Sequence, residues 1–222
     1  MVTPKRRARI EWVLHRRQPD LTVIMEDVNK AHNLAAIARS CDAVGVGEIY
    51  AVATSPKVSL THRVAAGCSR WVEVHRFSHL REVVDHLKGR GFQLLAAHLS
   101  DQAVDFREID YTKPTAVLVG AEQFGVSEMG QELADRHIKI PMMGMVESLN
   151  VSVATALILF EAQRQRLKAG FYDRRRLDEA SYRRLLEKWT APRPSCQLPE
   201  EVKRVKQAKE VPEQFRTAGL SE

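Results

Sequence analysis

The sequence predicts an α/β fold in which a parallel β-sheet carries helices on both faces. Short apolar runs rich in β-branched residues alternate with helical patterns between residues 21 and 168, and this alternation is typical of parallel sheets. The chain has 222 residues, 44% of them apolar and 28% charged, which is enough for one sizeable core. With this apolar content, a chain that is disordered throughout is excluded. Neither an internal repeat nor a low-complexity stretch is evident.

The expected elements follow one another in chain order. Residues 4–17 form a helix with Ile10, Val13 and Leu14 on one side and basic groups on the other. The predicted strands are the apolar segments 21–28, 47–53, 71–77, 92–99, 116–120 and 138–141. The predicted helices of the body are 33–44, 80–88 and 149–168, which end near Gly45, Gly91 and Gly170.

The chain divides into a basic N-terminal helix (1–20), a body (21–168) and a basic C-terminal extension (171–222). Apolar content falls after residue 170, where the tail contains four prolines and helical patches near 178–190 and 200–210. Residues 1–20 carry six basic and two acidic groups, residues 164–222 carry fifteen and nine, and the middle carries thirteen and seventeen. Basic ends around an acidic centre favour a catalytic body with arms for a polyanion, although solvated arginine-rich helices would give the same distribution.

The composition and the missing motifs exclude several classes of protein. Cys41, Cys68 and Cys196 are too few and too scattered for a disulfide framework, so we expect a reducing, cytoplasmic compartment. No apolar run is long enough for a membrane span, and no signal-peptide core follows the basic start. Phosphate-loop, dinucleotide-binding and GxSxG signatures are absent. His75 and His79 have no carboxylate beside them in sequence, so we interpret them as surface histidines and expect no metal.

Polar residues follow three of the predicted strands, where open α/β sheets bind their ligands. Asn33 and Arg39 lie near the start of the helix after the first strand. The segment 120–125 (GAEQFG) follows a strand directly, and its glycines would let a ligand approach the backbone closely. The segment 140–150 runs through a methionine-rich loop into a helix. Each segment alone is weak evidence, because methionine clusters are more often core and polar residues at a helix start commonly only cap it.

Together and in this order, the three segments resemble the signature motifs of the SPOUT-class (SpoU/TrmH) RNA ribose 2′-O-methyltransferases. The resemblance covers about residues 20–168. It rests on Asn33-x5-Arg39, Gly120-x-Glu122-x2-Gly125 and Ile140-Pro141-Met142 followed by Ser148-Leu149-Asn150. The flanking segments 16–23, 98–101 and 104–107 and the basic tail are similar to the bacterial branch of the family that methylates guanosine 18 of tRNA.

The resemblance implies a deep trefoil knot, built from about residues 93–160, that binds S-adenosylmethionine in a bent form. The implied cofactor-binding residues are His98, Leu99, Gly120, Ile140, Met142 and Leu149. Such a site suits adenine, which needs apolar walls and a few backbone hydrogen bonds. The implied catalytic residues are Arg39, Asn33, Glu122, Ser148 and Asn150.

Within the family, Arg39 has the central role. The ribose 2′-hydroxyl must be held in line with the methyl group and must lose its proton as it attacks. Because a guanidinium stays protonated, we interpret Arg39 as clamping the adjacent phosphate and stabilising the developing charge. The other four residues would orient Arg39, the ribose or the cofactor. Ser148 is also a candidate N-cap for the last helix, with Asn150 in its exposed first turn.

The family resemblance also implies partners. A homodimer would bury the apolar faces of residues 149–160 and 33–44 and complete the active site. The basic ends are expected to bind tRNA phosphates through Lys5, Arg6, Arg7, Arg9, Arg16, Arg17, Arg174, Arg175 and Arg176, with Arg183, Arg184, Lys203, Arg204 and Lys206 further along. Two alternatives stay open: a ribosomal RNA 2′-O-methyltransferase, which usually carries a different N-terminal RNA-binding domain, and a non-catalytic RNA-binding module.

Overall fold

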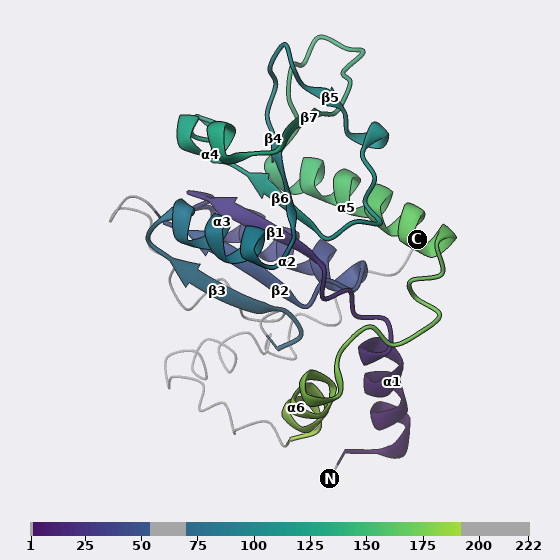
Figure 1. The fold of residues 1–222 in the computed structure, drawn as a ribbon. Helices are drawn as coiled ribbons and strands as arrows, with labels where there is room; N and C mark the ends of the chain where they lie inside the picture. The colour runs from purple at the N-terminus through teal and green to yellow at the C-terminus, as the bar shows by residue number, and fades with distance from the viewer. Residues whose placement is uncertain (1, 54–69, 192–222) are drawn as a thin grey trace, which may run out of the picture.

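A parallel sheet forms the centre of the protein in the computed structural model, which describes residues 2–53 and 70–191 (Figure 1). Its strands are β1 (Leu21–Glu26), β2 (Glu48–Val52), β3 (Glu73–Phe77), β4 (Gln93–Ala97), β5 (Val104–Asp105), β6 (Thr115–Val119) and β7 (Arg136–Lys139). Their order in the seven-stranded sheet is β3-β2-β1-β6-β4-β7-β5, and every pair of neighbours is parallel. The parallel sheet predicted from the alternating pattern is therefore confirmed.

Helices cover both faces of the sheet, as predicted (Figure 1). The helices are α1 (Pro4–Leu14), α2 (Ala31–Ala43), α3 (Leu80–Gly89), α4 (Glu128–Leu133), α5 (Val151–Lys168) and α6 (Glu179–Thr190), with a 3₁₀ turn, η2 (Phe106–Glu108). In the described parts of the chain, no helix is both long and apolar enough to cross a membrane. The predicted helix 4–17 ends earlier, at Leu14, whereas α2 is followed by Gly45 at φ +88°, a conformation that favours glycine.

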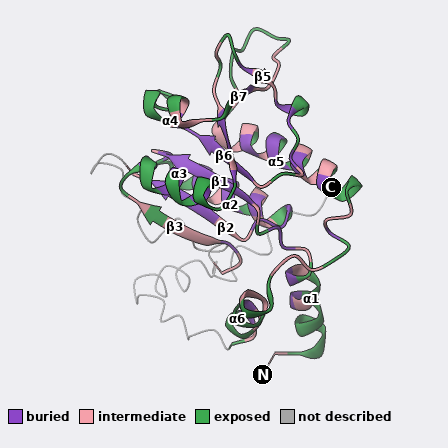
Figure 2. Ribbon diagram, viewed as in Figure 1, coloured by how far each residue is buried: buried purple, intermediate pink, exposed green. Residues whose placement is uncertain are grey.

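The core is split into two clusters by the sheet. Val23 and Met25 of β1 face the side covered by α2 and α5, and Ile24 faces the side covered by α3 and α4. All six residues of β1 are buried because this central strand is covered on both faces. The continuous apolar pattern of the strand thus reflects its position between two helical layers (Figure 2).

One expectation about the helices is wrong. The apolar face of α2 was expected to meet a partner subunit, but Leu34, Ile37, Ala38 and Cys41 are buried within this chain. They pack against the sheet and α5, which closes this face to any second molecule. Cys41 has a free thiol, and its pKa is raised because burial disfavours the thiolate.

The helices α1 and α6 lie side by side (Figure 1). Ile10 and Leu14 of α1 form a third apolar cluster with Leu185 and Trp189 of α6. The opposite faces of both helices are largely exposed (Figure 2). The helical patch predicted near 178–190 is therefore confirmed as α6. The patch predicted near 200–210, which contains Lys203, Arg204 and Lys206, lies outside the described residues. Cys68 and Cys196 lie outside them as well.

A buried arginine joins α5 to the loops that precede β1 and β6. Arg166 is fully buried, and its guanidinium donates to Asp20 Oδ1 at 2.6 Å and to Gln18 Oε1 at 3.1 Å. It also donates to the backbone oxygens of Tyr111 at 2.9 Å and Lys113 at 3.2 Å. The side chain therefore ties α5 to two segments far from it in sequence, residues 18–20 and 111–113.

Candidate active site

A cavity of about 410 Å³ lies at the carboxyl ends of β4, β6 and β7, bordered by the start of α5. All six predicted cofactor-binding residues line it: His98, Leu99, Gly120, Ile140, Met142 and Leu149. Three predicted catalytic residues, Glu122, Ser148 and Asn150, line it as well. The carboxyl ends of parallel strands are the usual ligand-binding edge of such sheets.

The shape and chemistry of this cavity fit S-adenosylmethionine. Its volume falls within the range of about 300–1,000 Å³ that is usual for small-molecule sites. Val119, Ile138 and Ile158 provide apolar walls, as adenine requires, and the backbone beside them offers hydrogen-bonding groups. The carboxylates of Glu122 and Glu147 also line the cavity and suit a cationic sulfonium.

A hydrogen-bond network joins three of the predicted catalytic residues. The side chains of Asn33 and Lys30 both donate to the carboxylate of Glu122. Asn150 Nδ2 donates to Asn33 Oδ1 at 3.3 Å. Asn33 is only 1% exposed, so a buried amide links α2 to the turn after β6 and to the start of α5. The three sequence motifs therefore meet at one point.

Lys30 was not among the residues predicted from the sequence. It precedes α2, and its ammonium forms an ion pair with Glu122. Only the folded chain reveals the partnership, because 92 residues separate the two groups. In the sequence, a lysine three residues before Asn33 belongs to no recognisable motif, so no local signal indicates its role.

The turn after β6 needs glycine for a reason within the turn itself. A Cβ at Gly120 would lie 1.9 Å from the backbone oxygen of Gly125. Gly125 N donates to Ala121 O at 2.7 Å, and Gly125 has φ +69°. The space beside Gly120 is therefore filled by the turn itself. Gly120 and Gly125 both line the cavity, so the expectation that the glycines of this turn let a ligand approach the backbone stays a prediction.

The structure also corrects the predicted cap of the last helix. The helix α5 begins at Val151, and its N-cap is Asn150 rather than Ser148. The Oδ1 atom of Asn150 accepts hydrogen bonds from Ser152 N at 2.9 Å and from Ser152 Oγ at 2.6 Å. Asn150 thus caps α5 with its oxygen and contacts Asn33 with its nitrogen.

We expect the substitution Asn150→Ala to lower the free energy of unfolding by about 1 kcal/mol, because the first turn of α5 loses its cap. Ser148→Ala is the matched control and should change stability by less than about 0.5 kcal/mol. Urea denaturation followed by circular dichroism measures both values. Equal losses in the two variants would contradict the assignment of the cap.

Arg39 lies outside the cavity, on the exposed side of α2. It is six residues from Asn33, or about 9 Å along a helix. Among residues 2–53 and 70–191, no side chain forms an ion pair with its guanidinium. Its charge is therefore free to meet an anionic ligand that approaches α2 from solvent.

The basic residues predicted to contact RNA differ in exposure. Lys5, Arg6, Arg7, Arg9 and Arg174 are exposed, whereas Arg16, Arg175 and Arg176 are half-buried. Arg176 also forms an ion pair with Asp20 at 2.6 Å. The exposed lysine and arginines of α1 make the outer face of this helix strongly basic.

Arg17 does not belong with these surface residues, and its assignment as an RNA contact is wrong. It is 1% exposed and donates to Asp42 Oδ1 at 2.7 Å, to Trp71 O at 2.8 Å and to Val46 O at 2.9 Å. Burial lowers the pKa of its guanidinium, which the nearby Asp42 carboxylate partly opposes. Arg17 therefore holds the N-terminal arm to the sheet.

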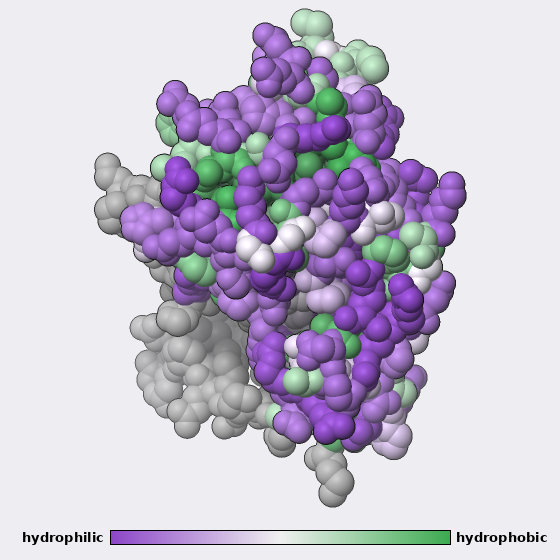
Figure 3. All heavy atoms as spheres, in the orientation of Figure 1, coloured by the Kyte–Doolittle hydropathy of each residue, from purple (hydrophilic) through white to green (hydrophobic). Residues whose placement is uncertain are grey.

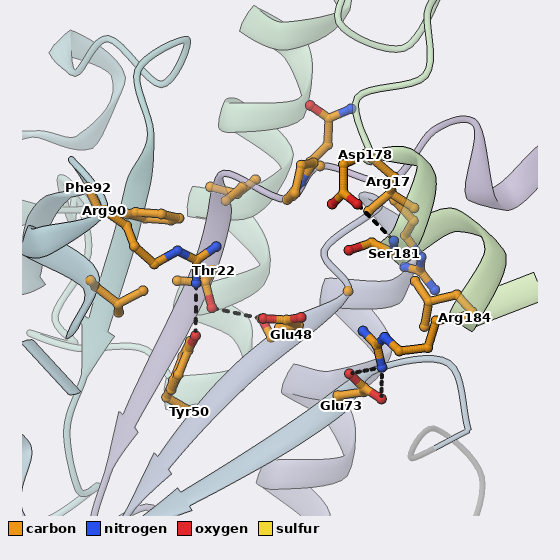
Figure 4. Close-up of a pocket in the computed structure, with 17 residues that line it drawn as sticks. Arg17, Thr22, Glu48, Tyr50, Glu73, Arg90, Phe92, Asp178, Ser181 and Arg184 are labelled. Carbon is orange, nitrogen blue, oxygen red and sulfur yellow. Dashed lines mark hydrogen bonds and ion pairs between the residues drawn. The ribbon is translucent and has the colours of Figure 1, made fainter. Parts of the chain in front are cut away.

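A second, smaller cavity of about 120 Å³ lies beside Arg17, between α6 and the amino ends of β1 and β2 (Figure 4). None of the predicted catalytic or cofactor-binding residues lines it. Nearby, Glu48, Glu73 and His75 place their ligand atoms within 4.8 Å of one another. His75 thus has one carboxylate neighbour on its own strand, Glu73, and one on the adjacent strand, Glu48. Glu73 is already paired with Arg184 at 3.2 Å (Figure 4) and with Lys188, which makes this an ion-pair cluster.

Comparison with family models and curated proteins gives consistent matches. The model of the SpoU rRNA methylase family matches residues 20–160, and a model of the C-terminal part of SpoU rRNA methylases matches residues 164–200. The chain is 58% identical to a tRNA (guanosine(18)-2′-O)-methyltransferase of Thermus thermophilus, over 84% of this chain and 96% of that protein. It is 55% identical to the protein of the same name from Escherichia coli, over 83% and 82%.

Solved structures agree in fold. The crystal structure of the Aquifex aeolicus TrmH/SpoU tRNA modifying enzyme superposes with a TM-score of 0.76 at 46% identity, covering 83% of this chain and 94% of that one. An AdoMet-bound rRNA methyltransferase from Sinorhizobium meliloti gives a TM-score of 0.59 at 32% identity, covering 69% and 59%. By sequence and by fold, the chain belongs to the SpoU methylase family, in the group of the tRNA (guanosine(18)-2′-O)-methyltransferases.

Proposed function

We propose that the protein transfers the methyl group of S-adenosylmethionine to the ribose 2′-hydroxyl of guanosine 18 in the D-loop of tRNA. The observation that carries this proposal is the 58% identity to a tRNA (guanosine(18)-2′-O)-methyltransferase across 84% of the chain. The match to the rRNA methyltransferase of Sinorhizobium meliloti covers only 69%, which favours tRNA over ribosomal RNA. A binding module without catalysis would need neither the cavity nor the network around Glu122. With tRNA as substrate, the protein acts in the cytoplasm.

When bound, S-adenosylmethionine supplies an electrophilic methyl group on a positively charged sulfur. His98, Leu99, Gly120, Ile140, Met142 and Leu149 line the cavity that would hold it. Apolar side chains such as Ile140 and Leu149 exclude water from the adenine, and backbone groups at the strand ends provide hydrogen bonds. Glu122 places a carboxylate beside the reacting region and is itself fixed by Asn33 and Lys30.

Arg39 would bind the phosphate next to guanosine 18. Because its guanidinium keeps its proton, it acts as a fixed positive charge that stabilises the negative charge developing on the 2′-oxygen. Asn33 and Asn150 are hydrogen-bonded to each other and orient the groups around the ribose, with Ser148 beside them in the cavity wall. Holding the hydroxyl in line with the methyl group supplies much of the rate.

The proposal includes a trefoil knot. Ala97 at the end of β4 and Val104 at the start of β5 both pair with Ile138, from opposite sides of β7. The loop 98–103 must therefore pass from one side of β7 to the other at its carboxyl end. The chain leaving β7 continues into the segment 140–150 and α5, which supports threading of that segment through the loop. Residues 21–168 would form this methyltransferase domain, flanked by the arms 1–20 and 171–222.

The test is methylation of defined RNAs by the purified protein. Unmodified tRNA, the same tRNA with adenosine in place of guanosine 18, and ribosomal RNA are each incubated with labelled S-adenosylmethionine. We expect one methyl group per tRNA, located at guanosine 18, and none on the substituted tRNA. Methylation of ribosomal RNA alone would refute the substrate, and tight tRNA binding without any transfer would favour the binding module.

The outer face of α1 is proposed as part of the tRNA-binding surface. The guanidiniums of Arg9 and Arg16 lie 4.3 Å and 4.0 Å from the ring centre of the exposed Trp12, so the indole holds two positive charges close together. Figure 3 shows hydrophilic side chains over most of α1 and α6, whereas hydrophobic ones gather over the part that holds α4, β6 and β7. The basic, hydrophilic outer face of α1 therefore suits the phosphate backbone of tRNA.

We expect Arg9→Gln and Arg16→Gln each to weaken tRNA binding and to reduce the slope of log affinity against log salt by about 0.7–0.9, one phosphate contact's share. Filter binding at several salt concentrations measures this slope. Arg81→Gln, which removes an exposed arginine from α3, is the matched control and should leave it unchanged. An identical slope in all three variants would exclude α1 from the interface.

A homodimer is proposed through the solvent-facing side of α5. Val153, Leu157 and Phe160 are 47%, 42% and 49% exposed, although they are apolar and follow one another at helical spacing. Met143 and Met145 in the adjoining loop are almost fully exposed. A contiguous apolar surface of this kind marks an interface. Since the apolar face of α2 is buried within the chain, the proposed contact is formed by α5 and the loop.

Sedimentation equilibrium tests the dimer. We expect the wild-type protein to have twice the mass of the chain, and Leu157→Glu to be monomeric because a carboxylate would be buried without a partner. Lys168→Glu, at an exposed position on the same helix, should stay dimeric. A monomeric wild-type protein would contradict the proposal.

A further inference from the structure

The loop 98–103 forms one wall of the cavity and has few apolar anchors of its own. His98 and Leu99 line the cavity, yet Leu99 is 67% exposed. Burial of apolar surface therefore does little to fix the end of the loop that faces the ligand. The backbone supplies two bonds, from His98 N to Ile138 O at 3.2 Å and from Ala103 N to Ser100 O at 3.0 Å.

Two consecutive hydrogen bonds through the side chain of His137 connect this loop to the sheet. Ser100 Oγ lies 2.9 Å from His137 Nδ1, and His137 Nε2 lies 3.1 Å from the backbone oxygen of Gln131. A carbonyl oxygen can only accept, so Nε2 carries the proton. In the neutral ring Nδ1 then accepts from the Ser100 hydroxyl. The imidazole of β7 thus connects α4 to the middle of the loop.

The same imidazole supports the cavity wall directly. The rings of His98 and His137 are 5.4 Å apart and nearly perpendicular, at 87°, an edge-to-face contact. The pKa of His98 is lowered by desolvation and by the neighbouring His137, which favours the neutral ring. A neutral ring in the wall does not repel the cationic sulfonium of the ligand.

We propose that Ser100 and His137 are positioning residues for the methyl donor, holding loop 98–103 in the conformation in which His98 and Leu99 complete the cavity wall. Neither residue lines the cavity, so both act through the loop. The inference rests on the proposed function, because it takes S-adenosylmethionine as the occupant. It assigns to the Ser100–His137 bond a role in affinity for the methyl donor rather than in the chemical step.

The test separates binding of the donor from turnover. We expect Ser100→Ala to raise the dissociation constant for S-adenosylmethionine about three- to tenfold, the usual value of one hydrogen bond, and to raise its KM by the same factor. The kcat at saturating donor should stay within twofold. Ser100→Thr keeps the hydroxyl and should restore wild-type affinity. Ser78→Ala, an exposed serine between β3 and α3, is the matched control.

A double-mutant cycle tests the pair itself. If Ser100 acts through His137, Ser100→Ala combined with His137→Phe binds the donor no more weakly than His137→Phe alone. Calorimetric titration without RNA gives the affinities, and thermal unfolding shows that each variant is folded. Unchanged affinity in Ser100→Ala, or equal losses in Ser100→Ala and Ser100→Thr, overturns this proposal alone. Failure of the wild-type protein to bind the donor overturns it together with the proposed function.

Discussion

Replacing Arg39 with alanine is expected to lower kcat for tRNA methylation by at least about a hundredfold, the usual cost of removing one group that stabilises developing charge. The KM for S-adenosylmethionine should stay within twofold, because Arg39 does not line the cavity. Stability should change by less than about 0.5 kcal/mol, since the side chain is exposed and away from the core. Single-turnover methylation at saturating tRNA and donor measures the chemical step.

Two further variants define how Arg39 acts. Arg39→Lys keeps the charge but loses the planar, two-pronged geometry, so an intermediate rate is expected. Arg81→Ala removes an exposed arginine from α3 and should leave the rate unchanged. If Arg39→Ala instead lost donor binding in proportion to its rate, or kept full activity, the role of a fixed charge at the phosphate would be wrong.

Replacing Arg166 with methionine is expected to lower the free energy of unfolding by about 3–5 kcal/mol, the usual cost of removing one partner from a buried ion pair. Arg166 is fully buried and donates to the side chains of Asp20 and Gln18 and to three backbone oxygens. Methionine fills the space but leaves these acceptors without a donor. Urea denaturation measures the loss, and weakened attachment of α5 should also lower the yield of folded protein.

Arg164 provides the comparison on the same helix. It is paired with Glu161 at 2.8 Å, but its side chain is 65% exposed. Arg164→Met should therefore cost less than about 1 kcal/mol, because solvent screens a surface pair. Similar losses at positions 164 and 166 would mean that burial does not determine the contribution of these arginines.

Local pattern was sufficient for most of the fold. Apolar runs such as that of β1 report burial on two faces, and Gly45 marks the end of α2 because its positive φ disfavours other residues. The elements missed, β5 with two residues and α4 with six, are too short to carry a period. The predicted cavity residues rested on family motifs, and the structure places all of them around one cavity.

What the pattern could not show depends on contacts between distant segments. Arg17 and Arg16 are adjacent and identical in type, yet only Arg17 is buried, because Asp42 and two backbone oxygens surround it. Ser148 and Asn150 are equally good caps by composition. Asn150 is the cap because α5 begins at Val151, and its amide also donates to the distant Asn33. Such outcomes require the tertiary structure.

The pairing of α1 with α6 also affects the order in which the protein can mature on the ribosome. The helix α1 is made first, but its apolar partners Leu185 and Trp189 belong to a segment synthesised more than 160 residues later. An isolated helix of eleven residues is marginal in water. During translation the basic N-terminal helix therefore has no stable packing partner until α6 has left the ribosome. The surface proposed to bind tRNA is assembled last, after the sheet and its cavity are complete.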